Sequence, residues 1–411
     1  MKRCRVRLKL SQEQECLAFQ HAATARKYWN LLVEIDNANN NGTYDAFCKS
    51  QNWRTYESKT HNRDVFHLGI QEYMTLASHV ASVASASSPD EWAWFYRPNQ
   101  SRIYNALAKE AVRVRNQNKG KLRFRSIRRT VPTFAVACHK SSNGKRPSRI
   151  YEKPNGRVQI PSIGDVKIGT VPKTADISCA KKSAKIIHDG KYWYLSFVYE
   201  DEPQPQSKNI TEGIGIDFGV KNLMTCSNGF VVENINKSRR VQLLERRLRR
   251  LQRRVSKKYM LNDPTKATKS ANIKKMEHDI RLIYRTLKNI RKTHMQTAVA
   301  RIIQLNPEYI AIEDLDVKGL MQNRHMSKQI GDCGFYAMRE QITRKACEHG
   351  IELRIVNRYY ASSKTCSCCG HKNSQLRLVD REFTCDNCGA QFDRDMNASI
   401  NLKNATDYTV M

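Results

Sequence analysis

The most constraining feature of this chain is the hexapeptide Ile214–Gly219, which reads IGIDFG and is followed by the run Val220–Thr225. Short apolar residues that lead into a glycine and a second apolar run are typical of a buried β-strand with a tight turn into its neighbour. Asp217 lies at the middle or the end of the first strand. A buried carboxylate is costly unless it is paired, and a divalent cation is a common partner. We therefore predict that Asp217 is a metal ligand.

The charge balance of the chain indicates a polyanionic partner. The 411 residues include 71 Lys and Arg against 39 Asp and Glu, a formal net charge of +32. This excess favours nucleic acid over a membrane surface, and a basic protein without such a partner is the alternative. No run of roughly 18 apolar residues could span a bilayer, and the first residues lack an apolar signal core. We expect an intracellular protein, in the cytoplasm and on the nucleoid when bound to DNA.

The N-terminal half changes its periodicity near residue 120. Residues 3–9 alternate basic with apolar side chains, as a strand does, and Ser11 is placed to cap a following helix. Helical patterns continue, with interruptions, to about residue 119. Residues 120–200 alternate with period two between turn residues, which predicts a small antiparallel sheet that residues 3–9 could join and that could close into a barrel. The polar, proline-containing segment 201–208 marks a domain boundary.

The C-terminal half predicts an alternation of strands and helices. The expected elements are three strands, a helical hairpin, a strand, a helix, a strand and a last helix, at about residues 213–218, 221–227, 229–233, 237–303, 308–315, 334–349, 351–356 and 395–404. This order fits an RNase H-like layer of helices on a mixed sheet. In such a fold the ends of the first and fourth strands and the start of the last helix converge.

Acidic residues stand at all three of those converging positions. Asp217 belongs to the first strand, Glu313 ends the fourth, and Asp393 and Asp395 open the last helix. Three carboxylates there could hold two Mg²⁺ ions about 4 Å apart, one activating water and the other stabilising the leaving 3′-oxygen of a phosphodiester. Taken singly, a strand-end Glu or a helix-start Asp is more often a cap or a surface acid. Their combination in so basic a chain favours the metal site.

The predicted hairpin has an apolar seam and one strongly basic helix. Apolar residues recur at 3,4 spacing in both arms, which is typical of two packed antiparallel helices. The first arm carries eight basic residues with few acidic partners: Arg246, Arg247, Arg249, Arg250, Arg253, Arg254, Lys257 and Lys258. A charge run is usually a solvated face. The scarcity of acidic partners here favours contact with nucleic-acid phosphates instead.

Four of the thirteen cysteines form a metal-binding pattern. Cys366 and Cys369, then Cys385 and Cys388, give C-x₂-C-x₁₅-C-x₂-C, and a glycine follows each pair. Four thiolates at this spacing are typical of a zinc ribbon, in which tetrahedral Zn²⁺ has no open position and is structural. Cys368 lies between two ligands as a spare thiol. The preceding segment, SSKT, either contacts phosphate or is an ordinary loop.

Four of these stretches together resemble the TnpB family, the RNA-guided nucleases that bacterial insertion sequences encode and that are related to type V CRISPR effectors. The stretches are GIDFGVKNLMT from Gly215, IAIEDL from Ile310, SSKTCSCCG from Ser362 and CDNCGAQFDRDMNASINL from Cys385. The resemblance covers about residues 210–405. The N-terminal half is similar in plan only, with RKYWN at residues 26–30 and GKLRF at 120–124 as loose matches.

The resemblance implies a fold class and a domain plan. The chain would be a multidomain α+β protein with a helical recognition segment and a β-barrel wedge, then an RNase H-like RuvC domain with an inserted zinc ribbon. The wedge would comprise residues 1–10 and 120–205 and the recognition segment 11–119. The RuvC-like domain would comprise 209–360 and 391–411, and the ribbon 361–390.

The resemblance also implies site residues, cofactors and partners. Asp217, Glu313 and Asp395 would be the catalytic carboxylates that bind two Mg²⁺ ions, with Asp393 the weaker candidate for the third position. The four paired cysteines would hold one structural Zn²⁺. The partners would be a guide RNA and double-stranded DNA, with one copy of the chain on each RNA and no membrane. Residues 15–120 match too little of the family to assign readers of a DNA motif.

Four hypotheses follow from these residues. The first is an RNA-guided, Mg²⁺-dependent DNA endonuclease associated with a transposable element. A compact type V CRISPR effector would share its chemistry and differ in genomic context. A nuclease-dead, RNA-guided repressor is disfavoured by the intact set of three acids. A strand-joining transposase is a poorer fit to the helical segment and the late zinc ribbon.

Overall fold

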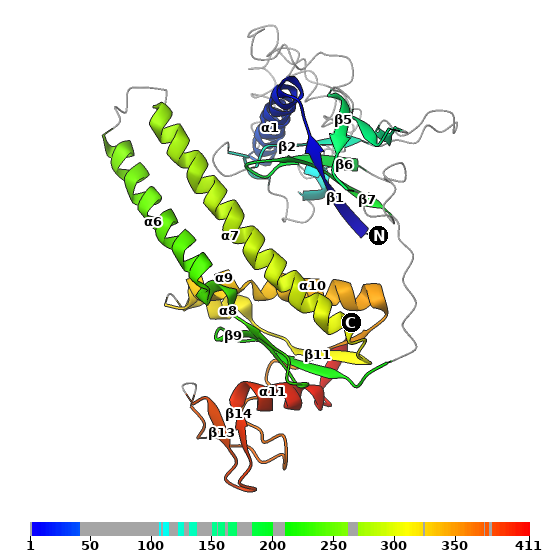
Figure 1. The fold of residues 1–411 in the computed structure, drawn as a ribbon, viewed down its shortest axis with the longest axis vertical. Helices are drawn as coiled ribbons and strands as arrows, with labels where there is room; N and C mark the ends of the chain where they lie inside the picture. Colours follow the sequence, from blue (N-terminus) through cyan, green and yellow to red (C-terminus); the bar gives the residue numbers. More distant parts are fainter. Residues whose placement is uncertain are drawn as a thin grey trace. The chain divides into compact units, whose positions relative to one another are not determined.

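In the computed structural model the chain forms two compact units, Met1–Asp201 and Glu202–Met411, and each is described by itself (Figure 1). Most of the predicted recognition segment and all of the predicted linker 201–208 lie outside the described residues. The structure describes residues 2–41, 107, 110–114, 122–126, 131–137, 150–153, 155–160, 163–170, 183–199, 210–261, 270–323, 325–373, 375–377 and 380–411.

The N-terminal unit combines one long helix with an antiparallel sheet in the order β2-β6-β7-β1-β5-β4-β3. The elements whose bounds the structure describes in this unit are β1 (Lys2–Lys9), α1 (Gln12–Asn40), β2 (Thr133–Ala137), β3 (Tyr151–Glu152), β4 (Arg157–Ile160), β5 (Gly164–Ile168), β6 (Ser183–His188) and β7 (Trp193–Tyr199). The first strand therefore joins the sheet, between β7 and β5. Among the strands that the structure describes, none links β2 to β3, so closure into a barrel stays a prediction.

Local sequence explains the start of this unit. The even-numbered side chains from Cys4 to Leu8 are buried and the arginines between them are exposed, as expected of a strand with one face on the core. Ser11 Oγ accepts the Gln14 N–H at 3.2 Å, and Gln14 Oε1 accepts the Ser11 N–H at 3.1 Å. This reciprocal capping fixes the first turn of α1.

The C-terminal unit is built on a six-stranded mixed sheet in the order β10-β9-β8-β11-β12-β15. Its elements are β8 (Ile214–Asp217), β9 (Asn222–Cys226), β10 (Val231–Glu233), the 3₁₀ turn η1 (Ile235–Lys237), α6 (Arg239–Met260), α7 (Ala271–Gln304), β11 (Tyr309–Glu313), α8 (Val317–Gln322), α9 (Ser327–Cys333), α10 (Phe335–His349), β12 (Glu352–Val356), β13 (Glu382–Thr384), β14 (Gln391–Asp393), α11 (Arg394–Lys403) and β15 (Tyr408–Val410).

The two faces of this sheet are covered by different helices. β8, β11 and β12 run parallel, while β9, β10 and β15 are antiparallel to their neighbours. One face packs Ile216 and Ile312 against α7, α9 and α10. The other packs Ala311 and Val356 against Leu402 of α11. The carboxyl ends of the three parallel strands therefore meet at one edge, with a helix layer on each side.

The remaining elements form two extensions of the sheet domain. α6 and α7 make an antiparallel hairpin whose seam contains Val241, Leu248, Ile283 and Leu287 (Figure 1). β13 pairs with β14, so the ribbon's hairpin extends to Asp393, a few residues beyond its predicted end. No helix in the described part of the chain has the length and apolar character needed to cross a bilayer.

Candidate metal centres

Asp217 and Glu313 occupy neighbouring positions at the carboxyl edge of the parallel strands. The pairing of β8 with β11 sets Ile216 opposite Ile312. One further residue along each strand sets Asp217 opposite Glu313, on strands about 4.8 Å apart. Both side chains lie on the face that α11 covers, because alternate residues of a strand share a face and Ala311 packs against that helix.

A glycine allows α11 to lie directly on β8. A Cβ on Gly215 would lie 2.0 Å from the carbonyl oxygen of Ser399 and 2.4 Å from the backbone nitrogen of Lys403. Any larger residue would push the helix away. Asp217, two residues further along the strand, points to the same face, so the start of α11 reaches its carboxylate.

The cap of α11 distinguishes its two acids. The Oδ1 atom of Asp393 accepts the backbone N–H groups of Asp395, at 2.9 Å, and of Met396, at 3.1 Å. Asp393 is exposed and serves as the N-cap, whereas Asp395 is only 9% exposed. The Oδ2 atom of Asp395 lies 4.0 Å from the point where a Cβ on Gly219 would stand. Asp395 is therefore the acid of α11 that faces the end of β8.

The acids form a site in which negative charge exceeds positive charge. Burial raises the pKa of Asp217 well above its usual value, and the charges of Glu313 and Asp395 raise it further, while Arg394 partly offsets them. Burial also raises the pKa of Glu313. Arg394 is itself 3.6 Å from Asp395. A divalent cation would supply the missing charge, and carboxylate oxygens are the ligands that Mg²⁺ prefers.

The four predicted cysteine ligands, which precede α11 in the chain, form a compact cluster. The Sγ atoms of Cys366 and Cys388 are 3.7 Å apart and those of Cys369 and Cys385 are 3.5 Å apart. A tetrahedron of Zn–S bonds of about 2.3 Å requires sulfur separations of about 3.8 Å. The thiols therefore fit Zn²⁺.

Among the described residues, this cluster is the only group of three or more Cys, His, Asp or Glu whose ligand atoms all lie within 4.8 Å of one another. The three carboxylates do not meet that spacing.

Backbone turns shape the cysteine cluster, and a backbone donor lowers the pKa of one of its thiols. Gly370 and Gly389 have φ of 74° and 70°, and their N–H groups each donate to the carbonyl of the first cysteine of the pair, at 2.9 Å. A donor from the His371 backbone, helped by the Asn387 side chain, lowers the pKa of Cys369 to about 6. Cys368 is exposed and outside the cluster.

Two buried asparagines, which the sequence pattern did not reveal as functional, tie this cluster to α11. Asn397 donates to the Thr365 carbonyl at 2.7 Å and accepts the Ser367 N–H at 2.9 Å. Asn401 donates to the carbonyls of Ser362, at 2.7 Å, and of Thr365, at 2.6 Å. Amides at i and i+4 on a short helix are the only sequence signal, and a solvated helix face has the same pattern. The Ser362 and Thr365 carbonyls of the SSKT segment therefore connect the cluster to α11, and contact of this segment with phosphate stays a prediction.

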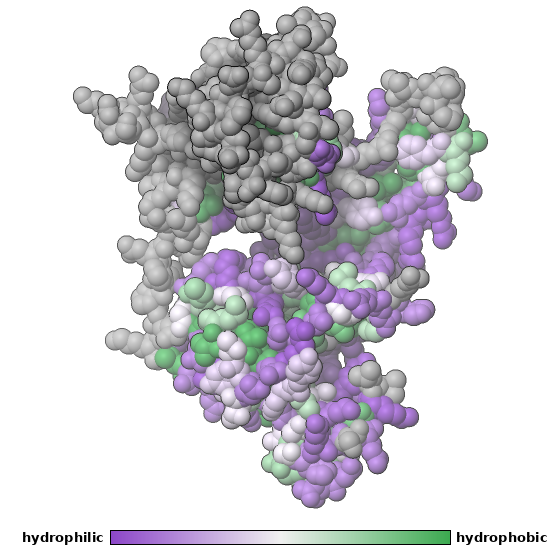
Figure 2. Space-filling model, turned by 180° about the vertical axis from the view of Figure 1, so that it is seen from behind, coloured by the Kyte–Doolittle hydropathy of each residue, from purple (hydrophilic) through white to green (hydrophobic). Residues whose placement is uncertain are grey.

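The eight predicted basic residues of α6 are all exposed. Within the described part of the chain, none of them is in an ion pair, because the acidic Glu245 of that helix pairs with Arg291 and Lys328 instead. Figure 2 shows hydrophilic residues over much of the coloured surface of the molecule. An exposed, unpaired row of cations on one helix is suited to phosphate contact.

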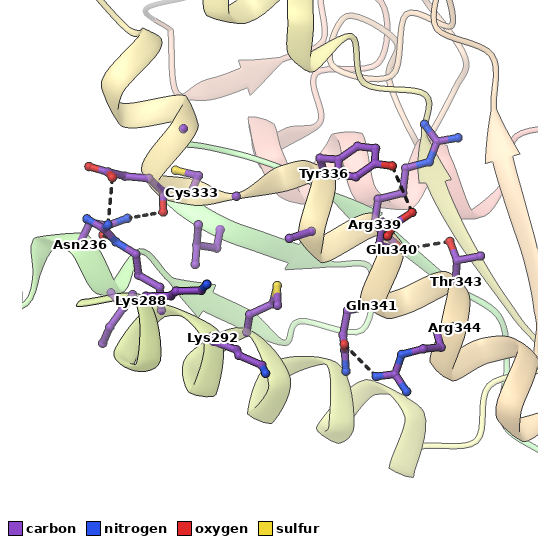
Figure 3. A pocket seen from close by; sticks show the side chains of 18 of the residues that line it. Asn236, Lys288, Lys292, Cys333, Tyr336, Arg339, Glu340, Gln341, Thr343 and Arg344 are labelled. Carbon is purple, nitrogen blue, oxygen red and sulfur yellow. Dashed lines mark hydrogen bonds and ion pairs between the residues drawn. The ribbon is translucent and has the colours of Figure 1, made fainter. Parts of the chain in front are cut away.

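A separate hollow of about 1060 Å³ lies between α7 and α10, away from the carboxylates. Lys288 and Lys292 line one wall, and Tyr336, Gln341 and Arg344 line the other (Figure 3). Its charges are partly paired, since Arg291 is 3.0 Å from both Glu245 and Asp332. The hollow contains none of the predicted site residues.

The family models that match this chain lie mainly in its C-terminal unit. Residues 196–324 match the family OrfB_IS605, described as "Probable transposase", and residues 335–402 match the family described as "Cas12f1-like, TNB domain". The chain is 33% identical over 210 residues to a "Putative RNA-guided DNA endonuclease" of Streptomyces pristinaespiralis, covering 51% of this chain and 49% of that protein. The predicted resemblance to the TnpB family is confirmed.

A second relative and one solved structure extend the comparison. The chain is 26% identical over 266 residues to "Putative RNA-guided DNA endonuclease InsQ" of Escherichia coli K12, covering 61% of this chain and 62% of that protein. It thus spans about half to three-fifths of the length of these two relatives. A Cas12f1 chain, solved by cryo-EM with sgRNA and target DNA, matches 97% of this chain and 84% of its own length, with a TM-score of 0.56 at 16% identity. That likeness shows a shared mixed α+β fold alone.

Proposed function

We propose that this protein is an RNA-guided DNA endonuclease of a transposable element, with Asp217, Glu313 and Asp395 as its catalytic carboxylates. The observation that carries the proposal is that β8, β11 and α11 bring these acids to one edge of the sheet. The nearby charges of Glu313 and Asp395 contribute to the raised pKa of Asp217. The strand order β10-β9-β8-β11-β12 supports an RNase H-like, RuvC-type domain. The similarity to two putative RNA-guided DNA endonucleases supports the RNA-guided activity.

The chain's part in hydrolysis is to hold three ionised acids in place. Two Mg²⁺ ions bound there would lower the pKa of water and neutralise the departing 3′-oxygen. The reaction breaks the P–O3′ bond. The water oxygen remains on phosphorus in a 5′-phosphate, and the leaving oxygen takes up a proton to become a 3′-hydroxyl. Because the pKa of Asp217 is raised, a higher pH favours its metal-binding form.

The other parts of the molecule would bring the target to that edge. Pairing with a guide RNA would read the DNA sequence, while the cations of α6 hold a nucleic-acid backbone without reading it. The cysteine cluster would hold one structural Zn²⁺ beside α11. One copy on one guide RNA is sufficient for this arrangement. A type V CRISPR effector would work in the same way and would differ in its neighbouring genes.

The test is purification with co-expressed RNA, sequencing of that RNA and an assay on a matching duplex. We expect cleavage with Mg²⁺, none in EDTA, and a loss of about 10³-fold or more in Asp217→Ala. Glu340→Ala, an exposed acid of α10, is the matched control and should cut normally. Retained cleavage in Asp217→Ala would refute the catalytic assignment. Strong guide-directed binding without cleavage in the wild type would favour a repressor.

A strand-joining transposase is the second candidate, because the family that matches residues 196–324 is described by that activity. It would use the same acids but would attack DNA with a 3′-hydroxyl instead of water. An assay with DNA carrying the ends of an insertion element separates the two. Joined products would favour the transposase, and cut products that depend on the guide RNA would favour the nuclease.

A further inference from the structure

The loop that follows β12 lies at the same sheet edge as the predicted catalytic acids. In the pairing of β11 with β12, Val356 stands opposite Glu313. The chain then continues along the carboxyl ends of the parallel strands as Asn357, Arg358 and Tyr359. Ligands of open sheets with parallel strands bind outside those ends. A nucleotide beside the scissile phosphate would therefore pass this loop.

The loop contains two adjacent tyrosines, of which the second packs against the protein and the first is exposed to solvent. Tyr360 packs against the α11 face and donates to the Asn401 carbonyl at 3.3 Å. Tyr359, by contrast, is 89% exposed. Its backbone is nevertheless fixed, because Asn357 Oδ1 accepts the Tyr359 N–H at 3.0 Å and the Asn357 carbonyl accepts the Tyr360 N–H at 3.0 Å. A large aromatic ring exposed to water contributes little to folding and is available to contact a ligand.

The surroundings of Tyr359 are hollow and nearly neutral. Tyr359 lines a hollow of about 520 Å³. Two arginines and two aspartates line the same hollow, and Arg358 is held at 3.1 Å by Asp314, which follows Glu313 in the chain. A second acid, Asp316, lies 3.7 Å from Arg358. Because these cations face at least as many acids, the hollow has no excess of positive charge and suits an uncharged, flat group better than a phosphate.

We infer that Tyr359 is a stacking platform for one base of the DNA strand that is being cut, with the adjacent hollow receiving that base. This inference rests on the proposed nuclease function. Stacking on tyrosine accepts every base and is strongest on a single strand, so it suits an enzyme whose sequence is read by RNA. Holding one flanking base fixes the position of the next phosphate relative to Asp217 and Glu313. Tyr359 is therefore a positioning residue.

Two variants and one control test the role in cleavage. Tyr359→Ala should slow cutting of a guide-matched target about 10-fold, within the range that loss of one stacked base produces, while guide-directed binding is unchanged. Tyr359→Trp should restore the rate, because indole also stacks. Tyr336→Ala removes another exposed tyrosine, on α10, and should cut normally. Targets with abasic sites around the cut should make the wild type and Tyr359→Ala equal.

A fluorescence experiment measures stacking on Tyr359 independently of DNA cleavage. The RNA-bound protein is mixed with target strands that carry 2-aminopurine at successive positions around the cut, and stacking on Tyr359 quenches the fluorescence at one position. Quenching that Tyr359→Ala abolishes supports the platform even if the wild type cuts nothing, in which case only the nuclease proposal fails. Quenching that persists in Tyr359→Ala, or equal slowing of normal and abasic targets, would overturn the inference.

Discussion

When Asp217 is ionised, the metal-free fold balances its charge only in part, through Arg394. Because the pKa of Asp217 is raised by folding, the folded state holds the proton more tightly than the unfolded chain, and ionisation lowers the free energy of unfolding. We expect Asp217→Asn to raise the melting temperature of the metal-free protein at pH 7.5 by about 2–4 °C, the shift that about 1 kcal/mol produces in a unit of this size. Calorimetry in EDTA measures it.

The pH dependence of that gain identifies its source. As the pH falls through the raised pKa towards the ordinary value, the wild-type carboxyl takes up its proton and the gain should disappear. Asp314→Asn is the control of opposite sign, since a hydrogen bond from Arg339 lowers the pKa of Asp314 and the substitution should destabilise. An Asp217→Asn protein that melts below the wild type in EDTA at pH 7.5 would contradict the prediction.

The sequence alone locates some of the site residues and leaves others undecided. Asp217 and Glu313 each end a short apolar strand, so the sequence alone locates them. Asp393 and Asp395 differ only by where α11 begins, and helix ends are uncertain by one or two residues in sequence terms. The cap hydrogen bonds of Asp393 decide between them. The exposed Tyr359 has no sequence signal, because Tyr360 beside it is chemically identical.

The contact between β8 and α11 depends on one missing side chain. Gly215→Ala would place a methyl group 2.0 Å from the Ser399 carbonyl, and relieving that overlap moves α11 and Asp395 with it. We expect destabilisation of about 1–3 kcal/mol and a loss of cleavage beyond what the lost stability explains. Gly331→Ala is the matched control, because its nearest atom would be Met321 Cε at 3.8 Å. Equal cleavage by both variants would show that α11 tolerates the shift.

The hydrogen bonds of Asn397 connect the cysteine cluster to the helix that carries Asp395. Asn397→Ala would leave the Thr365 carbonyl with one donor and the Ser367 N–H with none, and a buried unpaired group costs about 1–3 kcal/mol. We expect faster release of Zn²⁺ to a chromogenic chelator. Asn404→Ala, an exposed residue at the end of the same helix, should release the metal at the wild-type rate. Unchanged release from Asn397→Ala would remove the proposed connection.

At the scale of elements, helices and strands with a strong periodic pattern could be predicted from the sequence, and short helices and edge strands could not. The seam of α6 and α7 and the apolar strands β8 and β11 follow directly from residue spacing. The short helices α8 and α9 and the edge strand β15 lack enough residues to show a period. β15 exists because β12 offers a free edge, which no local pattern reveals. Tertiary pairing, rather than propensity, decides such elements.

At the scale of the whole molecule, the net charge of +32 should appear as a steep salt dependence of nucleic-acid binding, with α6 as a principal source. We expect a four-fold variant of α6 to reduce the slope of log K against log salt by about 3–4, because each phosphate contact contributes roughly 0.9 on duplex and 0.7 on a single strand. The substitutions, each to glutamine, are at Arg246, Arg249, Arg250 and Arg253.

The control must remove the same charge from another surface. Four exposed cations of α7 serve this purpose: Lys274, Lys275, Arg281 and Arg301. If α6 contacts the phosphates directly, its variant loses the larger part of the slope and the α7 variant loses little. Equal losses would mean that binding responds to total charge instead of a defined surface, because a diffuse field does not depend on which cations are removed. Filter binding of the guide RNA from 50 to 300 mM salt distinguishes these outcomes, and it does so whether or not the protein cuts DNA.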